Sequence, residues 1–574
     1  EKVYFLKRVY DVTDDVNGLK EAYAARGEQV GSRRIAAQME KLYAEATALE
    51  AVFSSSWSGE KDYVSVYKVY TDVRLVAAPP VSIGFFGGDE DNWAWPRHNC
   101  DFAMFRIYEN GSPVKTETPL KISLKGYYPG SFSMVIGFPG STDRNAPAAG
   151  TSFQEKITLP QESSLEKGRI GIVRRWMDAD QGIRLKYSDW FFGLTNVQEN
   201  KEGEVECLGR FRVAAEKRER EKELQEWIDA SPQRKERWGG LLRDLKEAYS
   251  QIRSGEEDKI RYRETVFQGQ LLCRYIFRAG NAASVEKAVG IMQEGLRATD
   301  PRLEKDLLEY SLEKIFTSLD RYYYGDIHKK LLARFGQDYK AMAAFLWEGS
   351  SLTSEEKLLE ISDMSLFKKD PFYKFFTDMS YKKFNDRGGH LEKWNKVKAL
   401  EKEYAVAMYR MEVEKGLQTY PDANSTMRIS YGSIGGFIPC DGVEYSYKTT
   451  PEGILEKYDP LRHDFNRDPK EATLLKKSKW GKWGFQGDDG TKTMYIDFIS
   501  DNDISGGNSG SPVLNSRGEL IGVAFDGNRE SLASDLGYTP GYNKCINTDI
   551  RFILWVLDKY AGMKHIIKEL SFAD

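Results

Sequence analysis

The residues best suited to covalent chemistry lie near the end of the chain, in the segment Ser505-Gly506-Gly507-Asn508-Ser509-Gly510-Ser511-Pro512. A serine hydroxyl is a weak nucleophile at neutral pH, so it needs a general base, an acid that orients the base, and donors for the oxyanion. Small residues let this segment curl until the amides of Gly507 and Ser509 aim at one developing oxyanion, and each donor is worth roughly 3–4 kcal/mol in the transition state. The pattern predicts Ser509 as a nucleophile, with Gly507 in its oxyanion hole.

The chain after this turn has the form of a β-hairpin. Asn515 to Glu519 is typical of a turn, and Leu520 to Phe525 is an apolar strand. A plain Gly/Ser turn between two strands, without chemistry, is the alternative interpretation of the same residues.

A second motif makes the prediction more specific. The segment Trp93-Ala94-Trp95-Pro96-Arg97-His98-Asn99-Cys100-Asp101-Phe102, taken with the serine turn, resembles the bacterial dipeptidyl-peptidases of the VII and XI type, and is most similar to the VII-type branch. The resemblance extends over essentially the whole chain and includes Asp422 to Thr426 and Asp549 to Trp555. It implies an α+β fold, a chymotrypsin-like double β-barrel whose first barrel is incomplete at its N-terminus, with a large inserted α-helical domain.

The resemblance also implies roles for single residues. Asp101 matches the triad aspartate that orients the imidazole, and Ser509 matches the nucleophile. Without the surrounding motif, Asp101 would be interpreted as a cap or a surface acid.

A histidine base is the missing part of this constellation. The family carries it in a Thr-Asn-His-His-Cys-like motif upstream of the triad aspartate, and the sequence has no such motif. None of the five histidines has that context: they are His98, His328, His390, His463 and His565. A local structural role is expected for His98. The abrupt start at Glu1 leads us to expect that the first part of the barrel, with a signal peptide and the triad histidine, precedes this chain, which alone would not run the triad.

An enzyme that removes dipeptides must recognise a free α-ammonium, which calls for a buried acid and amide acceptors to replace its hydration. The resemblance places Asn196, Asp526 and Trp93 in this role, with a loop amide as the alternative interpretation of Asn196. The acidic-P1 branch has an arginine at the position of Gly527, whose guanidinium would pair with a substrate carboxylate. Glycine there implies an open, uncharged S1 pocket that prefers hydrophobic or aromatic P1 residues; the alternative is a strand glycine at a bulge.

The elements that must position these residues change character twice along the chain. Residues 1–151 and 424–574 carry strand signals, such as Tyr63 to Tyr70 and Ser131 to Phe138, and predict the two parts of a peptidase β-domain. Residues 152–423 are rich in helical patterns and predict an inserted helical domain.

Within these regions several helices can be predicted individually. Gln38 to Phe53 and Glu204 to Trp227 each have helical spacing, and Ser231-Pro232 is typical of a helix N-cap.

Composition excludes several other classes of protein. The 574 residues carry a formal charge of −4, from 87 acids against 83 bases, and show no basic cluster of the kind that nucleic acid requires. No run of about 18 apolar residues predicts a membrane helix. The five cysteines are scattered without metal-ligand spacing, and no cofactor or metal is expected.

The leading hypothesis is therefore a serine exopeptidase that releases dipeptides from free N-termini of oligopeptides through an acyl-enzyme. The resemblance further implies a periplasmic or secreted protein and a homodimer. A trypsin-like endopeptidase and a non-catalytic peptide-binding protein remain as alternatives. Cleavage of N-blocked substrates would favour the first alternative, and the lack of a histidine base favours the second.

Overall fold

The computed structural model describes residues 2–487 and 490–574 of a mixed helix-and-sheet protein. It forms two compact units: residues 1–146 with 402–574 form the β unit, and residues 147–401 form the helical unit. The sequence predicts the divisions at 151/152 and 423/424. None of the described helices combines the length and the apolar character that a membrane span needs.

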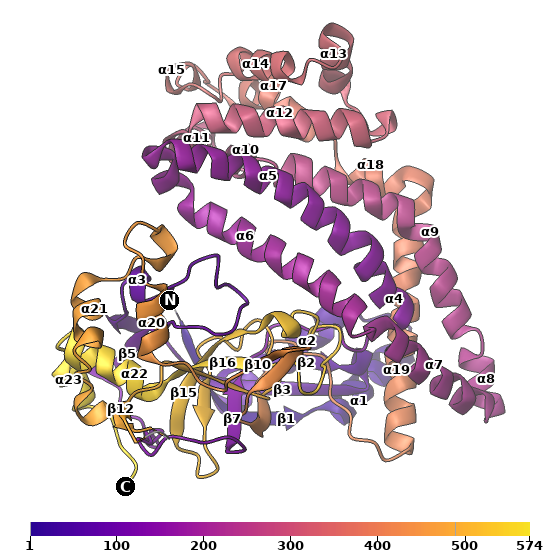
Figure 1. Cartoon of the computed structure of the whole chain (residues 1–574). Helices are drawn as coiled ribbons and strands as arrows, with labels where there is room; N and C mark the ends of the chain where they lie inside the picture. Colours follow the sequence, from indigo (N-terminus) through magenta and orange to yellow (C-terminus); the bar gives the residue numbers. More distant parts are fainter. Residues whose placement is uncertain (1, 488–489) are drawn as a thin grey trace. The chain divides into compact units, whose positions relative to one another are not determined.

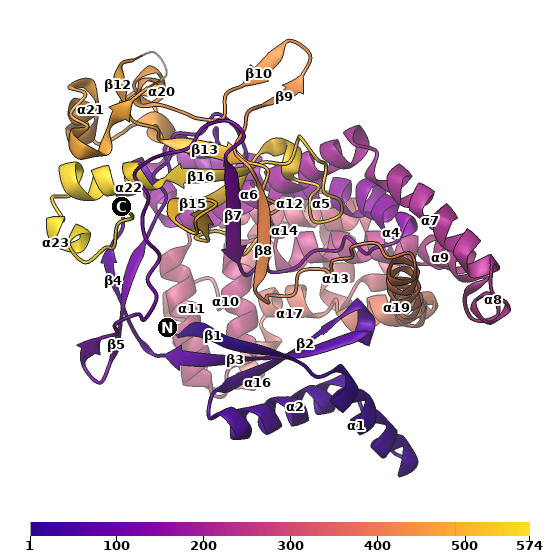
Figure 2. The same ribbon diagram turned by 90° about the horizontal axis from the view of Figure 1, so that it is seen from below.

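The largest sheet of the β unit is antiparallel and has six strands. Its order is β13 (Asp497–Ser500), β16 (Cys545–Asp549), β15 (Leu520–Gly527), β14 (Pro512–Leu514), β7 (Phe132–Gly137) and β8 (Arg428–Ser433). Although the whole helical unit separates β7 from β8 in sequence, the two strands pair side by side, with Ile136 opposite Ile429 (Figure 2). Buried apolar residues such as Val135, Phe498 and Val513 form the core of this sheet.

The N-terminal residues form a separate three-stranded sheet in the order β1 (Val3–Asp11), β3 (Lys61–Tyr70) and β2 (Glu50–Ser56). Helices α1 (Thr13–Ala25) and α2 (Ser32–Thr47) run along this sheet (Figure 2). Val64 and Val66 of β3 pack with Ile35 and Met39 of α2 in one buried cluster. The strand predicted over Tyr63 to Tyr70 is thus confirmed.

The helix predicted over Gln38 to Phe53 is wrong at both ends. The observed helix, α2, begins at Ser32 and ends at Thr47, because Ala48 adopts a left-handed conformation with φ of 56°. Residues after it join the sheet as β2, where Phe53 pairs with Val64. Cross-strand pairing therefore overrides the helical spacing.

Smaller elements complete the β unit. Its short strands are β4 (Asp72–Ala77), β5 (Met104–Glu109), β6 (Ser112–Pro113), β9 (Phe437–Cys440), β10 (Val443–Tyr445), β11 (Phe485–Gln486) and β12 (Lys492–Thr493). Its other helices are α3 (Val81–Gly84), α20 (Pro451–Lys457), α21 (Pro469–Lys476), α22 (Ile550–Trp555) and α23 (Lys564–Ile567).

The helical unit consists of α-helices that pack around two apolar cores. They are α4 (Ala148–Phe153), α5 (Leu159–Ala179), α6 (Gln181–Arg210), α7 (Val213–Asp229), α8 (Pro232–Trp238), α9 (Leu241–Tyr262), α10 (Leu271–Gly280), α11 (Val285–Ala298), α12 (Pro301–Ser318), α13 (Asp326–Phe335), α14 (Tyr339–Gly349), α15 (Glu355–Leu358), α16 (Met364–Lys369), α17 (Pro371–Thr377), α18 (Tyr381–Asp386) and the first part of α19 (His390–Glu414). Figure 1 shows α5 and α6 side by side.

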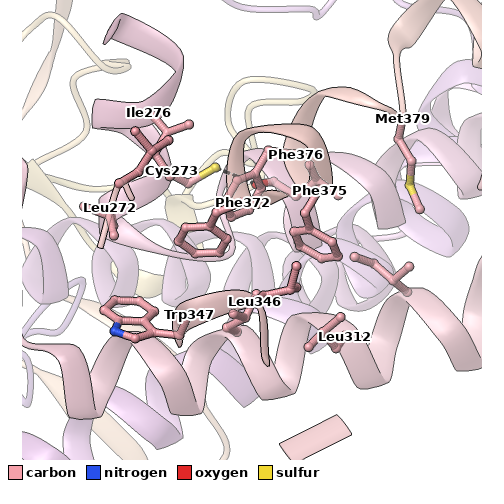
Figure 3. Packing of buried hydrophobic residues seen from close by; sticks show 14 of the residues in the cluster. Leu272, Cys273, Ile276, Leu312, Leu346, Trp347, Phe372, Phe375, Phe376 and Met379 are labelled. Atoms are coloured by element: carbon pink, nitrogen blue, oxygen red, sulfur yellow. Dashed lines mark hydrogen bonds between the residues drawn. The ribbon is translucent and has the colours of Figure 1, made fainter. Parts of the chain in front are cut away.

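The larger core lies where α10, α12, α14 and α17 meet (Figure 3). Three phenylalanines of α17 point into it: Phe372, Phe375 and Phe376, each with a relative exposure of 0%. They meet Leu312 of α12 and Leu346 of α14. Aromatic side chains bury large areas, so they dominate the stability of such a core.

Two sequence predictions can be compared directly with this unit. Ser231 accepts a hydrogen bond from the amide of Arg234 and caps α8, which confirms the predicted N-cap. The single helix predicted over Glu204 to Trp227 is instead two, because Arg212 adopts a left-handed conformation with φ of 54° between α6 and α7.

A buried carboxyl group lies inside the helical unit. Glu304 of α12 is fully buried and accepts hydrogen bonds from the Tyr187 hydroxyl at 2.7 Å and from the Leu272 amide at 3.2 Å. Burial raises the pKa of Glu304 from 4.5 to about 7, although these two hydrogen bonds oppose the shift. Between pH 4.5 and about pH 7 the Glu304 carboxyl is therefore mostly protonated in the folded protein and mostly ionised in the unfolded chain.

This shift predicts a pH-dependent stability. Because the pKa is higher in the folded state, the free energy of unfolding falls as the pH rises from 4.5 to 7, by about 3 kcal/mol in total. Glu304→Gln removes this loss, so the variant gains stability relative to the wild type between pH 5 and pH 8. Urea unfolding followed by circular dichroism at both pH values measures the difference. Glu309→Gln on the same helix controls for the loss of one charge, and an equal effect of Glu304→Gln at both pH values would contradict the prediction.

Candidate active site

The predicted nucleophile lies on an exposed turn that is bonded to a neighbouring strand. Pairing of Pro512 with Val523 joins β14 to β15 directly after the turn. The Gly510 amide donates to the Ala524 carbonyl at 2.8 Å, and Ser509 Oγ donates to the Phe525 carbonyl at 3.2 Å. The hydroxyl of Ser509 is thus held next to Phe525 of β15, and Ser509 is exposed to solvent.

The turn that carries the predicted oxyanion donors has a left-handed backbone conformation at Gly507. Gly507 has φ of +105°, and a Cβ atom there would lie 2.6 Å from the Phe138 carbonyl oxygen, so only glycine fits. The amides of Gly507 and Ser509 donate no hydrogen bond to any residue that the structure describes. Both N–H groups are therefore available to an oxygen atom of a ligand.

Asp101 lies in the loop before β5 with an exposed side chain. Its carboxylate accepts no hydrogen bond from the described part of the chain. The side chain reaches solvent, yet the surrounding protein displaces much of the water, and this desolvation raises its pKa. The negative charge of Asp526 raises the pKa of Asp101 further, whereas Arg97 lowers it.

Asp526 is held by an arginine that the sequence interpretation missed. Arg97 is 2% exposed, and its Nη2 atom donates to Asp526 Oδ2 at 2.6 Å. The Gly527 amide donates to the other oxygen, Oδ1, at 2.9 Å. Two carboxylates, Asp101 and Asp526, thus lie in the field of one guanidinium, so the cluster carries one net negative charge.

The sequence did contain a signal for Arg97, since it stands inside the motif Trp95-Pro96-Arg97-His98. A sequence gives no partner for a buried arginine, however. The partner, Asp526, is 429 positions away.

The rest of this motif is anchored to the C-terminal part of the β unit. The Trp95 indole donates to the Ser446 carbonyl at 2.8 Å, and the Asn99 amide donates to the buried Asp497 at 2.8 Å. Trp93 is half-buried with φ of +55°, and its buried indole N–H has no hydrogen-bond partner among the described residues. The bonds of Trp95 and Asn99 hold the segment that carries Arg97 and Asp101.

None of the five histidines is hydrogen-bonded to Ser509 in the part of the chain that the structure describes. His98 is buried, its Nε2 atom packs against Gly453, and burial lowers its pKa to about 3. The other four are His328 and His390 in the helical unit, and His463 and His565 on the surface of the β unit. Among the described residues, no histidine forms a hydrogen bond with Ser509 or Asp101.

The last two predicted site residues have different surroundings. Gly527 is buried opposite Cys545, and a Cβ atom there would lie 2.5 Å from Ser531 Oγ. Asn196 lies on α6 of the helical unit and is half-buried.

No cluster of three or more His, Cys, Asp or Glu suited to a metal ion occurs among the described residues.

Known proteins match this chain over almost its whole length. The model of the peptidase S46 family matches residues 1–572. Dipeptidyl-peptidase 7 of Porphyromonas endodontalis is 33% identical over 99% of this chain and 71% of the relative, and an Asp/Glu-specific dipeptidyl-peptidase of Capnocytophaga gingivalis is 31% identical over 99% and 83%. The crystal structure of Porphyromonas endodontalis DPP11 in complex with the dipeptide Arg-Glu matches with a TM-score of 0.85 and 25% identity, covering 100% of this chain and 86% of that one. The chain belongs to the peptidase S46 family.

Proposed function

We propose that this peptidase is a serine exopeptidase that releases dipeptides from free N-termini. One observation carries the proposal: the Ser509 turn is hydrogen-bonded to the same strand, β15, on which Arg97 holds Asp526. A nucleophile and a negatively charged cluster that are both bonded to one short strand provide a reacting group and a binding group for an ammonium ion at a fixed separation. Such a separation would select the second peptide bond.

The reaction proposed for the site is acyl transfer. Ser509 Oγ attacks the carbonyl carbon of the second peptide bond while a base takes its proton, and the oxyanion accepts hydrogen bonds from the amides of Gly507 and Ser509. The C–N bond then breaks, the base returns the proton to the leaving amine, and water hydrolyses the acyl-enzyme. We also propose, on the family resemblance, that the β unit is part of a chymotrypsin-like double β-barrel.

We propose that the base is a histidine outside these 574 residues and that Asp101 orients it. Two observations on the described residues support this assignment: no histidine is hydrogen-bonded to Ser509 or Asp101, and the Asp101 carboxylate accepts no hydrogen bond. Without that base, the chain alone is expected to be inactive.

Asp526 is the centre of the proposed amine clamp. Asp526 is paired with Arg97, and with Asp101 beside them the cluster has a formal charge of −1, which favours a substrate ammonium at Asp526. Trp93 and Asn196 complete the clamp in this proposal. The assignments of both Trp93 and Asn196 rest on the family resemblance.

Gly527 is proposed to leave the S1 pocket uncharged, so that hydrophobic or aromatic P1 residues are preferred. The relatives of this chain include both dipeptidyl-peptidase 7 and Asp/Glu-specific enzymes. The neutral glycine favours the first type, because an acidic P1 side chain would need a cation. Periplasmic or secreted localisation and a homodimer are proposed on the family resemblance.

The nucleophile and the P1 preference can be tested in one assay of the full-length protein. Fluorogenic dipeptides with Leu, Met or Phe at P1 should be cleaved faster than one with Asp. Ser509→Ala should lower kcat by about 10⁴-fold or more, because the acyl-enzyme cannot form. Ser516→Ala, at an exposed serine of the following turn, is the matched control. Activity surviving in Ser509→Ala would refute the nucleophile, and preference for Asp would refute the P1 assignment.

A substitution at Gly527 should change the P1 preference. Gly527→Arg should lower kcat/KM for Leu at P1 and raise it for Asp, each by at least about 10-fold, because the guanidinium fills the pocket and pairs with a carboxylate. The Ser531 hydroxyl would have to rotate away, so Gly527→Arg is also made with Ser531→Gly to provide room. Gly527→Met adds similar bulk without charge and should lose activity on Leu without gaining it on Asp. Equal gains on Asp for Met and Arg would contradict the prediction.

A further inference from the structure

The orientation of one peptide bond controls the predicted oxyanion hole. The Gly506 carbonyl accepts a hydrogen bond from the Gly140 amide at 2.6 Å. In a planar trans peptide the carbonyl and the following N–H point in opposite directions. A carbonyl held toward Gly140 therefore fixes the Gly507 N–H on the other side, where the oxyanion would form. Rotation of this peptide would remove one of the two donors.

The turn that carries Gly140 is itself held by the chain that returns from the helical unit. The Ser425 amide donates to the Pro139 carbonyl at 2.9 Å, and Ser425 Oγ donates to the Gly140 carbonyl at 3.3 Å. Ser425 has φ of +64°, a conformation that a serine keeps only where its surroundings enforce it. Ser425 belongs to the segment Asp422 to Thr426, which the family resemblance singles out without giving it a role.

Asp422 joins this segment to the chain that leads into the helical unit. Its carboxylate accepts hydrogen bonds from the Thr142 hydroxyl at 2.7 Å, from the amides of Arg144 at 2.6 Å and Asn145 at 3.2 Å, and from the Asn145 side chain at 2.8 Å. These four donors belong to Thr142, Arg144 and Asn145. Because all of them bond to one carboxylate, residues 142–145 have little conformational freedom.

Arg144 extends the same network to the serine turn. Its Nη2 atom donates to Asp503 Oδ1 at 2.7 Å, and its Nη1 atom bonds to the other oxygen of Asp503, which makes the contact bidentate. Asp503 precedes Ser505, the first residue of the serine turn, by two positions. The turn is therefore held at its start by Arg144 and at Gly506 by Gly140.

We propose that Asp422 and Arg144 are positioning residues for the oxyanion hole. They hold residues 139–145 in place, so that the hydrogen bond from the Gly140 amide fixes the orientation of the Gly506 carbonyl. The Gly507 N–H then faces the reacting carbonyl. The inference rests on the proposed assignment of Ser509 and Gly507. It assigns a role to the Asp422 segment that neither the triad nor the amine clamp requires.

The test uses Asp422→Ala and Asp422→Asn in the full-length protein. Loss of one oxyanion donor costs about 10²–10³ in kcat, so Asp422→Ala, which loosens the lock, should lower kcat by about 10–100-fold. KM should stay within about two-fold, because the clamp at Asp526 is untouched. A dipeptide boronate, whose oxygen occupies the oxyanion hole, should lose affinity by the same factor as kcat/KM. The affinity of the product dipeptide should not change, and Asp422→Asn, which keeps one acceptor oxygen, should be intermediate.

Asp468→Ala is the matched control, because Asp468 also accepts two backbone amides in the β unit but caps α21. It should leave kcat and boronate affinity at wild-type values, and thermal unfolding shows which variants are folded. Wild-type kcat in folded Asp422→Ala would overturn the inference, as would a parallel loss of boronate and product affinity. An inactive wild-type enzyme would instead refute the proposed function, so the two failures can be distinguished.

Discussion

The site depends on the ion pair between Arg97 and Asp526. A buried guanidinium without a partner, or a buried carboxylate without one, is strongly destabilising, so each residue requires the other. The pair joins the Trp93 to Phe102 loop to β15, 429 positions later in the sequence. It thereby brings Asp101 beside the strand that carries the candidate amine clamp, and it leaves the cluster with one net negative charge.

Strand register sets the rest of the arrangement. Pro512 pairs with Val523 and Gly522 pairs with Asp549, so β15 is held on both sides. Because side chains alternate along a strand, a slip of one residue would turn Asp526 to the opposite face. The carbonyl of Phe525, which accepts from Ser509 Oγ, would move with it. The segments of the β unit before and after the inserted helical unit are bonded to each other through Asp422.

Local patterns were enough to predict the serine turn, the strand at β3 and the cap at Ser231, because each depends on a few neighbouring residues. Helix ends were less predictable. Ala48 follows α2 and Arg212 precedes α7, both in left-handed conformations that their residue types do not favour and that their surroundings select. Arg97 could not be assigned a partner, since a pair 429 positions apart leaves no local pattern.

The central claim is that a free α-ammonium, held at Asp526, determines where the peptide is cut. The most direct measurement is mass spectrometry of the products that the full-length protein forms from one oligopeptide, with its N-terminus free or acetylated. The account predicts successive dipeptides from the free peptide and no cleavage of the acetylated one. Internal cleavage of the acetylated peptide at a comparable rate would contradict it and would indicate an endopeptidase.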